Sequence, residues 1–448
     1  MKYKEHRHIS TSQFIFLGFL FTILTGSLIL MLPFASKAGK ITSFIDAMFT
    51  ATSATCVTGL VVHDTATFWS EFGQAIILFL IQIGGMGVIT IAVLLTMMSG
   101  RKISLRQRSL MQEAISAPKM EGIVRLTGFI FKTIITIELL GATFMFPVFY
   151  KQFGVVKGIW YAVFHSVSAF CNAGFDLMGI KEPYSSLTTL SDSVMINVVI
   201  MALIVIGGLG FITWEDIKKH KYHFRKYKMQ SKVIILVTAL LIIIPTIYFY
   251  FCEFRLGKWD DMSTSNKVMA SFFTSITPRT AGFNTVDFTE LTGAGQMVII
   301  LLMLIGGAPG STAGGMKVTT MAVIFATAYA VFRRKQEAHF FKRRIATDII
   351  AKAATILLMY VFLFLVSAIV ISSIEGLPIV DVMFETASAI GTVGLTLGIT
   401  TELCTVSKII LIILMFFGRV GGLTIIFAAV SGNNGNITRF PEEKIMVG

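Results

Sequence analysis

The sequence has few charged residues, few prolines and few cysteines for its length. Only 14% of its 448 residues are charged, whereas an ordinary soluble domain has about 25%. Because 54% of the residues are apolar and 39 are phenylalanine, the composition argues against a water-soluble enzyme and against a disordered protein. The four cysteines form neither a CxxC pair nor a Cys/His ligand spacing, so the sequence predicts no disulfide framework and no zinc site.

Long apolar runs are what the sequence has instead. A helix rises 1.5 Å per residue, so crossing about 30 Å of hydrocarbon takes about 20 apolar residues. Seven runs of that length cover residues 14–33, 76–98, 126–149, 194–213, 233–252, 353–374 and 409–430, and an eighth near 297–332 is broken by glycines. These runs predict an all-α integral membrane protein with eight transmembrane helices.

The charged residues between the runs are unevenly distributed. One set of loops and tails carries 25 Lys and Arg residues, and the alternate set carries 10. Because basic loops stay in the cytoplasm, we expect a multi-pass protein of the cell membrane with both termini cytoplasmic. The outer loops hold 15 of the 25 acidic residues, which would concentrate cations at the outer face. The net charge of +13 therefore reflects topology, and no nucleic-acid partner is predicted.

Each expected outer loop contains a short apolar run that ends in a glycine-containing stretch. The last glycines of these stretches are Gly59, Gly174, Gly282 and Gly394, at spacings of 115, 108 and 112 residues. A second glycine cluster follows each of them, 24 to 33 residues later, inside the next span. Such self-similarity indicates a unit of span, short re-entrant helix, extended glycine strand and span, present four times.

The number of crossings decides how the four units are arranged. A unit that crosses twice returns the chain to its starting side, whereas inverted repeats need an odd number of crossings. We therefore expect four tandem span–pore helix–span repeats around one pseudo-fourfold pore. The expected divisions are a cytoplasmic tail (1–13), repeat 1 (14–98), repeat 2 with its preceding cytoplasmic loop (99–213), repeat 3 with an interrupted last span (214–332), repeat 4 (333–430) and a C-terminal tail (431–448).

A short helix that enters from outside directs the negative end of its dipole toward the bilayer centre. Asp46 and Asp381 suit the opposite, N-terminal ends of the first and fourth short helices. Extended backbone at that depth is tolerated where it lines a water-filled path, and rings of its carbonyl oxygens can replace the hydration shell of a cation. We expect the four last glycines to supply positive φ angles or close approaches there.

The third unit departs from the others, and this departure predicts a gate. Five glycines and one proline within ten residues cannot hold a helix, since each Gly costs about 1 kcal/mol and each Pro about 3 relative to Ala. The ten residues, which can lie across the path, are Gly306, Gly307, Ala308, Pro309, Gly310, Ser311, Thr312, Ala313, Gly314 and Gly315. In the fourth unit Arg419 takes the place of a glycine and would face the cavity as a positive barrier; pairing with Glu138 is the alternative.

The fourfold arrangement, with one glycine per filter stretch, resembles the Trk/Ktr/HKT superfamily of potassium transporters, and is most similar to the membrane subunit of bacterial Ktr systems. The resemblance implies that backbone carbonyls of four filter stretches coordinate K⁺. These stretches are Thr55, Cys56, Val57, Thr58 and Gly59; Phe170, Cys171, Asn172, Ala173 and Gly174; Pro278, Arg279, Thr280, Ala281 and Gly282; and Ile390, Gly391, Thr392, Val393 and Gly394. Each stretch keeps only its last glycine in common with the potassium-channel signature, which implies a looser filter.

The resemblance also implies partners: a second copy of the chain in a homodimer, and a cytosolic nucleotide-binding regulatory ring that relieves the gate. Membrane lipid is the expected surrounding, K⁺ the transported ion, and Na⁺ stays open as an activator; no organic cofactor is expected in this chain. The expected function is K⁺ uptake. A Na⁺- or H⁺-coupled symporter and a membrane-embedded enzyme are the alternatives, although the sequence shows no catalytic cluster.

Overall fold

The computed structural model describes residues 10–88, 90–91, 93, 96, 103–115, 121–422 and 424–425 of the chain. Over these residues the fold is helical apart from one two-stranded hairpin, formed by β1 (His339–Phe340) and β2 (Arg343–Arg344). Residues 1–9 of the expected N-terminal tail and the whole expected C-terminal tail (431–448) lie outside the described residues, as does the end of the last expected span.

The long apolar runs form helices. Within the described residues, four helices are long and apolar enough to cross a membrane, and the bent pair α8 (Val194–Gly208) and α9 (Phe211–His220) would make a fifth crossing. The four are α1 (Thr11–Leu30), α7 (Ile123–Phe170), α10 (Met229–Tyr248, prolonged by a π-helical turn to Glu253) and α14 (Thr347–Glu375). The other expected spans hold the shorter helices α4 (Glu71–Met86), α12 (Gly293–Met303), α13 (Val318–Phe332) and α16 (Thr405–Val420).

Several of these helices are shorter than their apolar runs because glycines end them. Gly87 follows α4, Gly210 lies between α8 and α9, and Gly421 follows α16; their φ angles are +85°, +85° and +88°. A positive φ is incompatible with a continuing right-handed helix, and glycine adopts it without steric cost. At Gly210 the axis turns by 97° between α8 and α9.

Short helices precede the four glycine-containing stretches. They are α2 (Phe44–Cys56), α11 (Thr264–Ile276), α15 (Ile379–Gly391) and the last part of α7, which non-helical backbone at Gly154 (φ +77°) separates from its first part. Ser43 and Ser263 cap α2 and α11 by accepting hydrogen bonds from backbone N–H groups three residues later. Asp46 and Asp381 lie in the first turns of α2 and α15, as expected.

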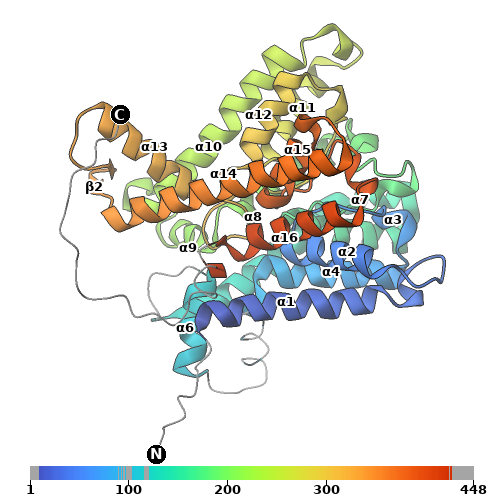
Figure 1. Ribbon diagram of the computed structural model, residues 1–448, viewed down its shortest axis with the longest axis horizontal. Coiled ribbons are helices and arrows are strands. Elements are labelled where there is room, and N and C mark those ends of the chain that lie inside the picture. The colour runs from blue at the N-terminus through green and yellow to red at the C-terminus, as the bar shows by residue number, and fades with distance from the viewer. Residues whose placement is uncertain are drawn as a thin grey trace, which may run out of the picture.

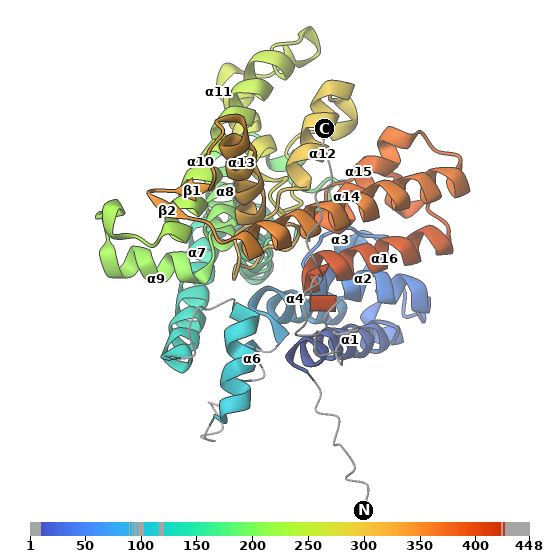
Figure 2. The same cartoon turned by 60° about the vertical axis from the view of Figure 1, so that its left-hand side comes forward.

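The helices pack as four groups that follow one another along the chain. α1, α2 and α4 form the first, α7 and α8 the second, α10, α11 and α13 the third, and α14 to α16 the fourth; α12, which follows α11 along the chain, is counted with the third. Contacts of α4 with α7, α8 with α11 and α12 with α15 join each group to the next, and α16 packs on α2 of the first group. The chain thus closes into a circuit, in which the last helices (red) lie beside the first (blue) in Figures 1 and 2.

The two ends of the molecule differ in what connects the helices. α6 (Leu105–Ile115), α9 and the β1–β2 hairpin lie at one end, and the short helix α3 (Thr65–Phe68) lies at the other (Figure 1). Between them the outer helix faces are apolar: Phe21, Leu358 and Phe362 are 72%, 75% and 63% exposed. Apolar side chains exposed at this density match a lipid surrounding.

Candidate ion-conducting site

Four segments, residues 55–59, 170–174, 278–282 and 390–394, have positive φ angles at the same two positions and are called the glycine segments here. The expected extended strand is shorter than these segments, because α2 continues to Cys56 and α15 to Gly391. Their last residues are Gly59, Gly174, Gly282 and Gly394, with φ angles of +96°, +72°, +82° and +92°, as the sequence predicts. All twenty residues of the segments are buried.

A second position of the glycine segments also has a positive φ, although no glycine occupies it. Two residues before each last glycine stand Val57, Asn172, Thr280 and Thr392, with φ angles between 51° and 64°. A left-handed conformation costs a residue with a side chain about 1–2 kcal/mol, so the surrounding structure must impose it four times. The sequence gives no signal for these positions, because three of the four residues are not of the types that tolerate this conformation.

The four last glycines meet in a ring. A Cβ built on Gly59 would lie 3.1 Å from the Cα of Gly174, and one on Gly174 would lie 3.0 Å from the Cα of Gly282. One on Gly282 would lie 3.3 Å from the Cα of Gly394, and one on Gly394 would lie 2.9 Å from the Cα of Gly59. The circuit of helices therefore closes at its centre on four backbones so close that a side chain has no room.

Hydroxyl groups of the short helices hold the glycine segments from behind. Ser53 and Ser388 each accept a hydrogen bond at 3.0 Å, from the N–H groups of Gly59 and Gly394. Ser168 and Thr277 donate at 2.7 and 2.5 Å to the carbonyls of Phe175 and Phe283, one residue past the glycine. Sequence reasoning missed these four residues, although a hydroxyl five or six residues before each glycine is a signal in the aligned units.

Arg279 is the one charged residue of the glycine segments. Its side chain is buried, and its Nη2 donates to Thr238 Oγ1 of α10 at 3.2 Å. Its carbonyl oxygen accepts a hydrogen bond from Asn172 Nδ2 of the second segment at 3.3 Å. The guanidinium thus packs on α10, while the backbone contributes to the contact between two segments.

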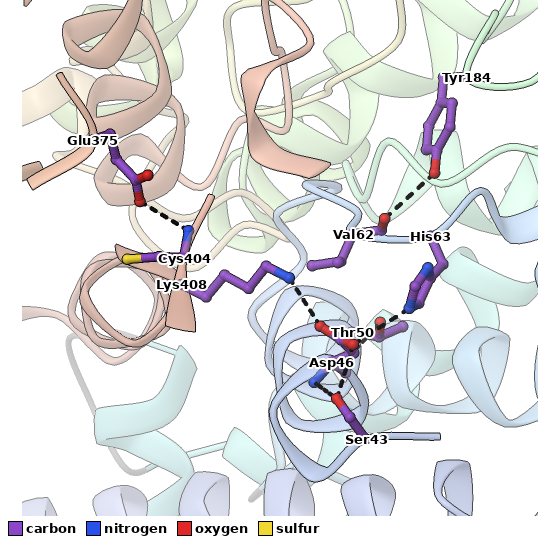
Figure 3. A network of polar contacts seen from close by, with 9 residues as sticks. All are labelled: Ser43, Asp46, Thr50, Val62, His63, Tyr184, Glu375, Cys404 and Lys408. Carbon is purple, nitrogen blue, oxygen red and sulfur yellow. Dashed lines mark hydrogen bonds and ion pairs between the residues drawn. The ribbon is translucent and has the colours of Figure 1, made fainter. Parts of the chain in front are cut away.

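Asp46 links the first and fourth groups at the end of the molecule that carries α3 (Figure 3). Its carboxylate accepts hydrogen bonds from Ser43 of its own cap at 2.8 Å and from Lys408 of α16 at 3.1 Å, and it lies 3.4 Å from His63 Nε2. Burial raises the pKa of Asp46, but the hydrogen bonds from Ser43 and Lys408 and the charges of Lys408 and His63 outweigh it, so the pKa lies below its ordinary value. The first and fourth groups are thus braced beside the first glycine segment.

The helix break expected at Gly306–Gly315 is present, since α12 ends at Met303 and α13 begins at Val318. The residues between them, 304–317, form what we call the interrupting loop. Thr312 Oγ1 of this loop donates to Asn172 Oδ1 at 2.9 Å, and the N–H of Gly315 donates to the carbonyl of Gly418 at 3.0 Å. The loop therefore lies between the second glycine segment and α16.

The interrupting loop also packs against the bend between α8 and α9. The N–H of Ala308 donates to the carbonyl of Gly208 at 2.9 Å, and the N–H of Phe211 donates to the carbonyl of Gly310 at 2.7 Å. Backbone groups that α8 leaves unpaired at its end are thus satisfied by the loop, which is what burial of non-helical backbone requires.

Arg419 of the fourth group contacts the first and third groups at once. Its guanidinium donates to the carbonyl of Thr312 in the interrupting loop and to the carbonyls of Gly84 and Gly85 in α4. Lys317 Nζ donates to the loop carbonyls of Ala313 and Gly314 at 2.7 and 3.3 Å. Two cationic side chains therefore hold the loop through backbone oxygens.

Glu138 of α7 does not pair with Arg419, so that alternative is wrong. Its carboxylate accepts a hydrogen bond from Gln82 of α4 at 3.3 Å, and Cys171 Sγ of the second glycine segment lies 3.9 Å from its Oε1. Glu138 is 6% exposed and lies beside the second glycine segment. It is a buried acid that adjoins the ring without an ion-pair partner among the described residues.

Comparisons with known proteins agree with this geometry. The family model TrkH, described as a cation transport protein, matches residues 5–437. The chain is 41% identical to the potassium/sodium uptake protein NtpJ of Enterococcus hirae, over the whole chain and 99% of that protein. It is 39% identical to the Ktr system potassium uptake protein B of Bacillus subtilis, over 97% of the chain and 96% of that protein.

The fold is similar to a solved structure as well. The crystal structure of the potassium transporter TrkH from Vibrio parahaemolyticus superposes with a TM-score of 0.72 at 19% identity, covering 95% of this chain and 86% of that one. The expected family is confirmed, and the alternative of a membrane-embedded enzyme is wrong. The chain belongs to the TrkH cation transport family and is a multi-pass membrane transporter.

Proposed function

We propose that this protein takes up K⁺ across the cell membrane through a selective pore on the axis of its ring of four glycines. The observation that carries the proposal is the closure of that ring by Gly59, Gly174, Gly282 and Gly394. The four glycine segments, each with two positive-φ positions, would direct carbonyl oxygens toward a dehydrated cation. The names of the two relatives above, which are potassium or potassium/sodium uptake proteins, support K⁺ as the ion.

The proposal includes the architecture expected from the sequence. Four tandem span–pore helix–span repeats, with eight spans and four re-entrant helices, would surround the pore in pseudo-fourfold symmetry. The circuit of helix groups and the same pair of positive-φ positions in all four segments support this arrangement. Both termini would be cytoplasmic, which places α6, α9 and the β1–β2 hairpin on the inner face.

The interrupting loop is the proposed gate beneath the filter. It lies under two glycine segments: Thr312 contacts Asn172 of the second, and a Cβ on Gly315 would meet the backbone of Gly391 in the fourth. Opening requires the loop to leave the carbonyl contact that Arg419 makes with it, whereas the bonds of Lys317 lie within the loop itself. Both cations add a positive barrier to K⁺ while the loop is in place.

The proposed partners follow from the Ktr system named for one relative. We propose that the chain works as a homodimer, and that a cytosolic nucleotide-binding ring docks on the end that carries α6 and α9. The interrupting loop bonds to Phe211 at the start of α9, so a force on α9 would reach the gate directly.

A Na⁺-coupled symporter is the second candidate. The name of the NtpJ relative includes sodium, and the Glu138 carboxylate, which accepts a hydrogen bond from Gln82 Nε2 at 3.3 Å, is a buried oxygen group beside the second glycine segment. A reversal potential that follows both the Na⁺ and the K⁺ gradients would favour coupling. One that follows K⁺ alone would favour the passive pore.

The test is a single substitution, Gly59→Ser. A side chain at this positive-φ position would press on the Gly174 backbone and displace the carbonyl of Ala173 from the ring. We expect the K⁺/Na⁺ flux ratio in proteoliposomes to fall about tenfold, the effect of about 1.4 kcal/mol in relative ion affinity.

The matched control is Gly293→Ser, at the exposed start of α12, where a Cβ meets nothing within 4 Å. Growth of a strain that lacks K⁺ uptake, with and without the regulatory subunit, measures the function in cells. An unchanged flux ratio in Gly59→Ser, with normal expression, would remove the filter assignment.

A further inference from the structure

A basic cavity lies at the α9 end of the molecule, away from the ring of glycines. Its volume is about 960 Å³, and α6, the first turns of α7, and α9 line it. Figure 2 shows the three helices side by side. Arg108, Arg125, Lys132 and Lys218 are its charged lining residues, and no acidic residue lines it.

The four bases of this cavity have no acidic partner among the described residues. Lys218 Nζ lies over the ring of Phe129, 4.3 Å from its centroid. Lys228, which precedes α10, differs in this respect, because its Nζ lies 3.9 Å from Glu215 and 3.7 Å from Asp216 of α9. Glu121 and Glu215 line an adjoining cavity of about 700 Å³ instead, which shares Arg125 and Lys218 with the basic one.

The cavity extends from the N-terminus of α7 along the side of this helix. Arg125 lies in the first turn and Lys132 two turns further on, about 10.5 Å along the axis at 1.5 Å per residue. Thr133 and Ile137 continue the lining in the same direction. At Gly128 a Cβ would meet nothing within 4 Å, so no other part of the protein covers the helix surface between Arg125 and Lys132.

The position of Lys132 calls for a ligand. Its side chain is exposed on a helix whose outward surface is apolar further along, where Leu139 and Phe144 are 59% and 55% exposed. An ammonium group at the hydrocarbon boundary is costly unless it reaches the headgroup layer or meets an anion. The stem of Lys132 can turn its ammonium toward Arg125, where both would meet one phosphate.

We propose that this cavity binds an anionic phospholipid of the inner leaflet, with its phosphate on Arg125, Lys132, Lys218 and Arg108 and its acyl chains along Thr133 and Ile137. Basic pockets between helices at the cytoplasmic side suit such headgroups. That this end faces the cytoplasm rests on the proposed function. An apolar continuation distinguishes the cavity from the β1–β2 hairpin, whose Arg344 is exposed and pairs with Glu337 at 3.0 Å.

The test uses the purified full-length protein in detergent, with dioleoylphosphatidylglycerol as the probe and native mass spectrometry as the readout. We expect the wild-type protein to retain the lipid, and the double variant Arg125→Gln/Lys132→Gln to bind it roughly thirtyfold more weakly, as expected for two basic residues at an anionic surface. The charge-conserving variant Arg125→Lys/Lys132→Arg should bind the lipid as the wild-type protein does. That result would show that the double Gln variant loses binding because it loses charge, and not because these positions tolerate no substitution.

The matched control is Lys342→Gln/Arg343→Gln, which removes the same charge from the exposed hairpin. An equal loss of lipid in this control would overturn the proposal in favour of general surface attraction. Equal retention of dioleoylphosphatidylcholine would overturn the anionic headgroup, and displacement by glycerol phosphate at equal concentration would identify a free-anion site instead. Because binding is measured without ion flux, a failure here is distinct from a failure of the proposed K⁺ uptake.

Discussion

The ring of glycines and the interrupting loop lie next to each other but are built in opposite ways. The ring uses one backbone conformation four times, with positive φ at each last glycine and two residues before it. The loop occurs once, and a different loop residue makes each of its contacts with Gly208, Gly418 and Asn172. In the proposed function, the repeated conformation would surround a spherical ion with equivalent ligands, and the single loop would be free to move as a gate.

The two regions diverge at one aligned position of the inner helices. Gly87, Gly210 and Gly421 occupy it in the first, second and fourth groups, and Pro309 occupies it in the third. A glycine there lets the chain turn once and resume as helix, as between α8 and α9. Proline fixes φ near −65° and cannot adopt the positive φ of the three glycines, and in the third group the chain is not helical between Met303 and Val318.

The largest effect should come from breaking the ring. Gly282→Ala places a Cβ against the backbones of Gly174 and Gly394 at a φ of +82°, where the strain costs about 1–3 kcal/mol. We expect K⁺ flux in proteoliposomes to fall about 10- to 100-fold while expression stays normal. Gly293→Ala is the control, and wild-type flux in Gly282→Ala would mean that the ring does not touch the ion path.

An opposite change should follow when the loop is released. Arg419→Gln removes charged hydrogen bonds to Thr312 and to α4, each of which contributes about 1.5–3 kcal/mol. We expect K⁺ flux to rise about tenfold or more, and shortening residues 308–315 should raise it as well. Arg333→Gln, on the exposed end of α13, should leave flux unchanged; background flux in Arg419→Gln with normal expression would contradict gating by this residue.

The smallest effect concerns the brace between the first and fourth groups. Lys408→Met leaves Asp46 without its α16 partner and should lower the free energy of unfolding by about 1.5–3 kcal/mol. The more exposed pair of Lys267 and Asp260 gives the control, since Lys267→Met should cost at most about 1 kcal/mol. Flux should change little in either variant, because neither residue reaches the ring.

The brace also has a pH dependence. Since the pKa of Asp46 is lowered in the folded protein, its carboxylate stabilises the fold at and above the ordinary Asp pKa, and this contribution is lost as pH falls through the lowered value. Lys408→Met should therefore shift acid unfolding to higher pH. Thermal unfolding in detergent between pH 3 and 7 measures the shift, and identical profiles for variant and wild type would contradict it.

Local sequence signals predicted much of the glycine segments and of the interrupting loop. The apolar runs, the positions of the four last glycines, their positive φ angles and the break at Gly306–Gly315 all follow from spacing and residue type. Each of these features is decided within a few residues of the chain, by the steric freedom of glycine or by the cost of glycine and proline in a helix.

What could not be predicted depends on partners far apart in the sequence. Arg419 bonds to Gly84, 335 residues earlier, and Asp46 to Lys408, 362 residues later. The left-handed conformation of Val57 is imposed by its surroundings and contradicts its intrinsic preference. The bend of 97° between α8 and α9 also depends on a distant partner, because the N–H of Phe211 donates to the carbonyl of Gly310 in the interrupting loop.

The ring of glycines belongs to a single polypeptide, and this has a genetic consequence. In a channel assembled from four subunits, a mutant copy can enter mixed tetramers and inactivate most of them. Here every ring is encoded by one message, so a cell that makes both forms contains only fully normal and fully altered rings. A damaging allele at Gly282 should thus be recessive at the pore itself, and any dominance would have to arise where separate molecules touch.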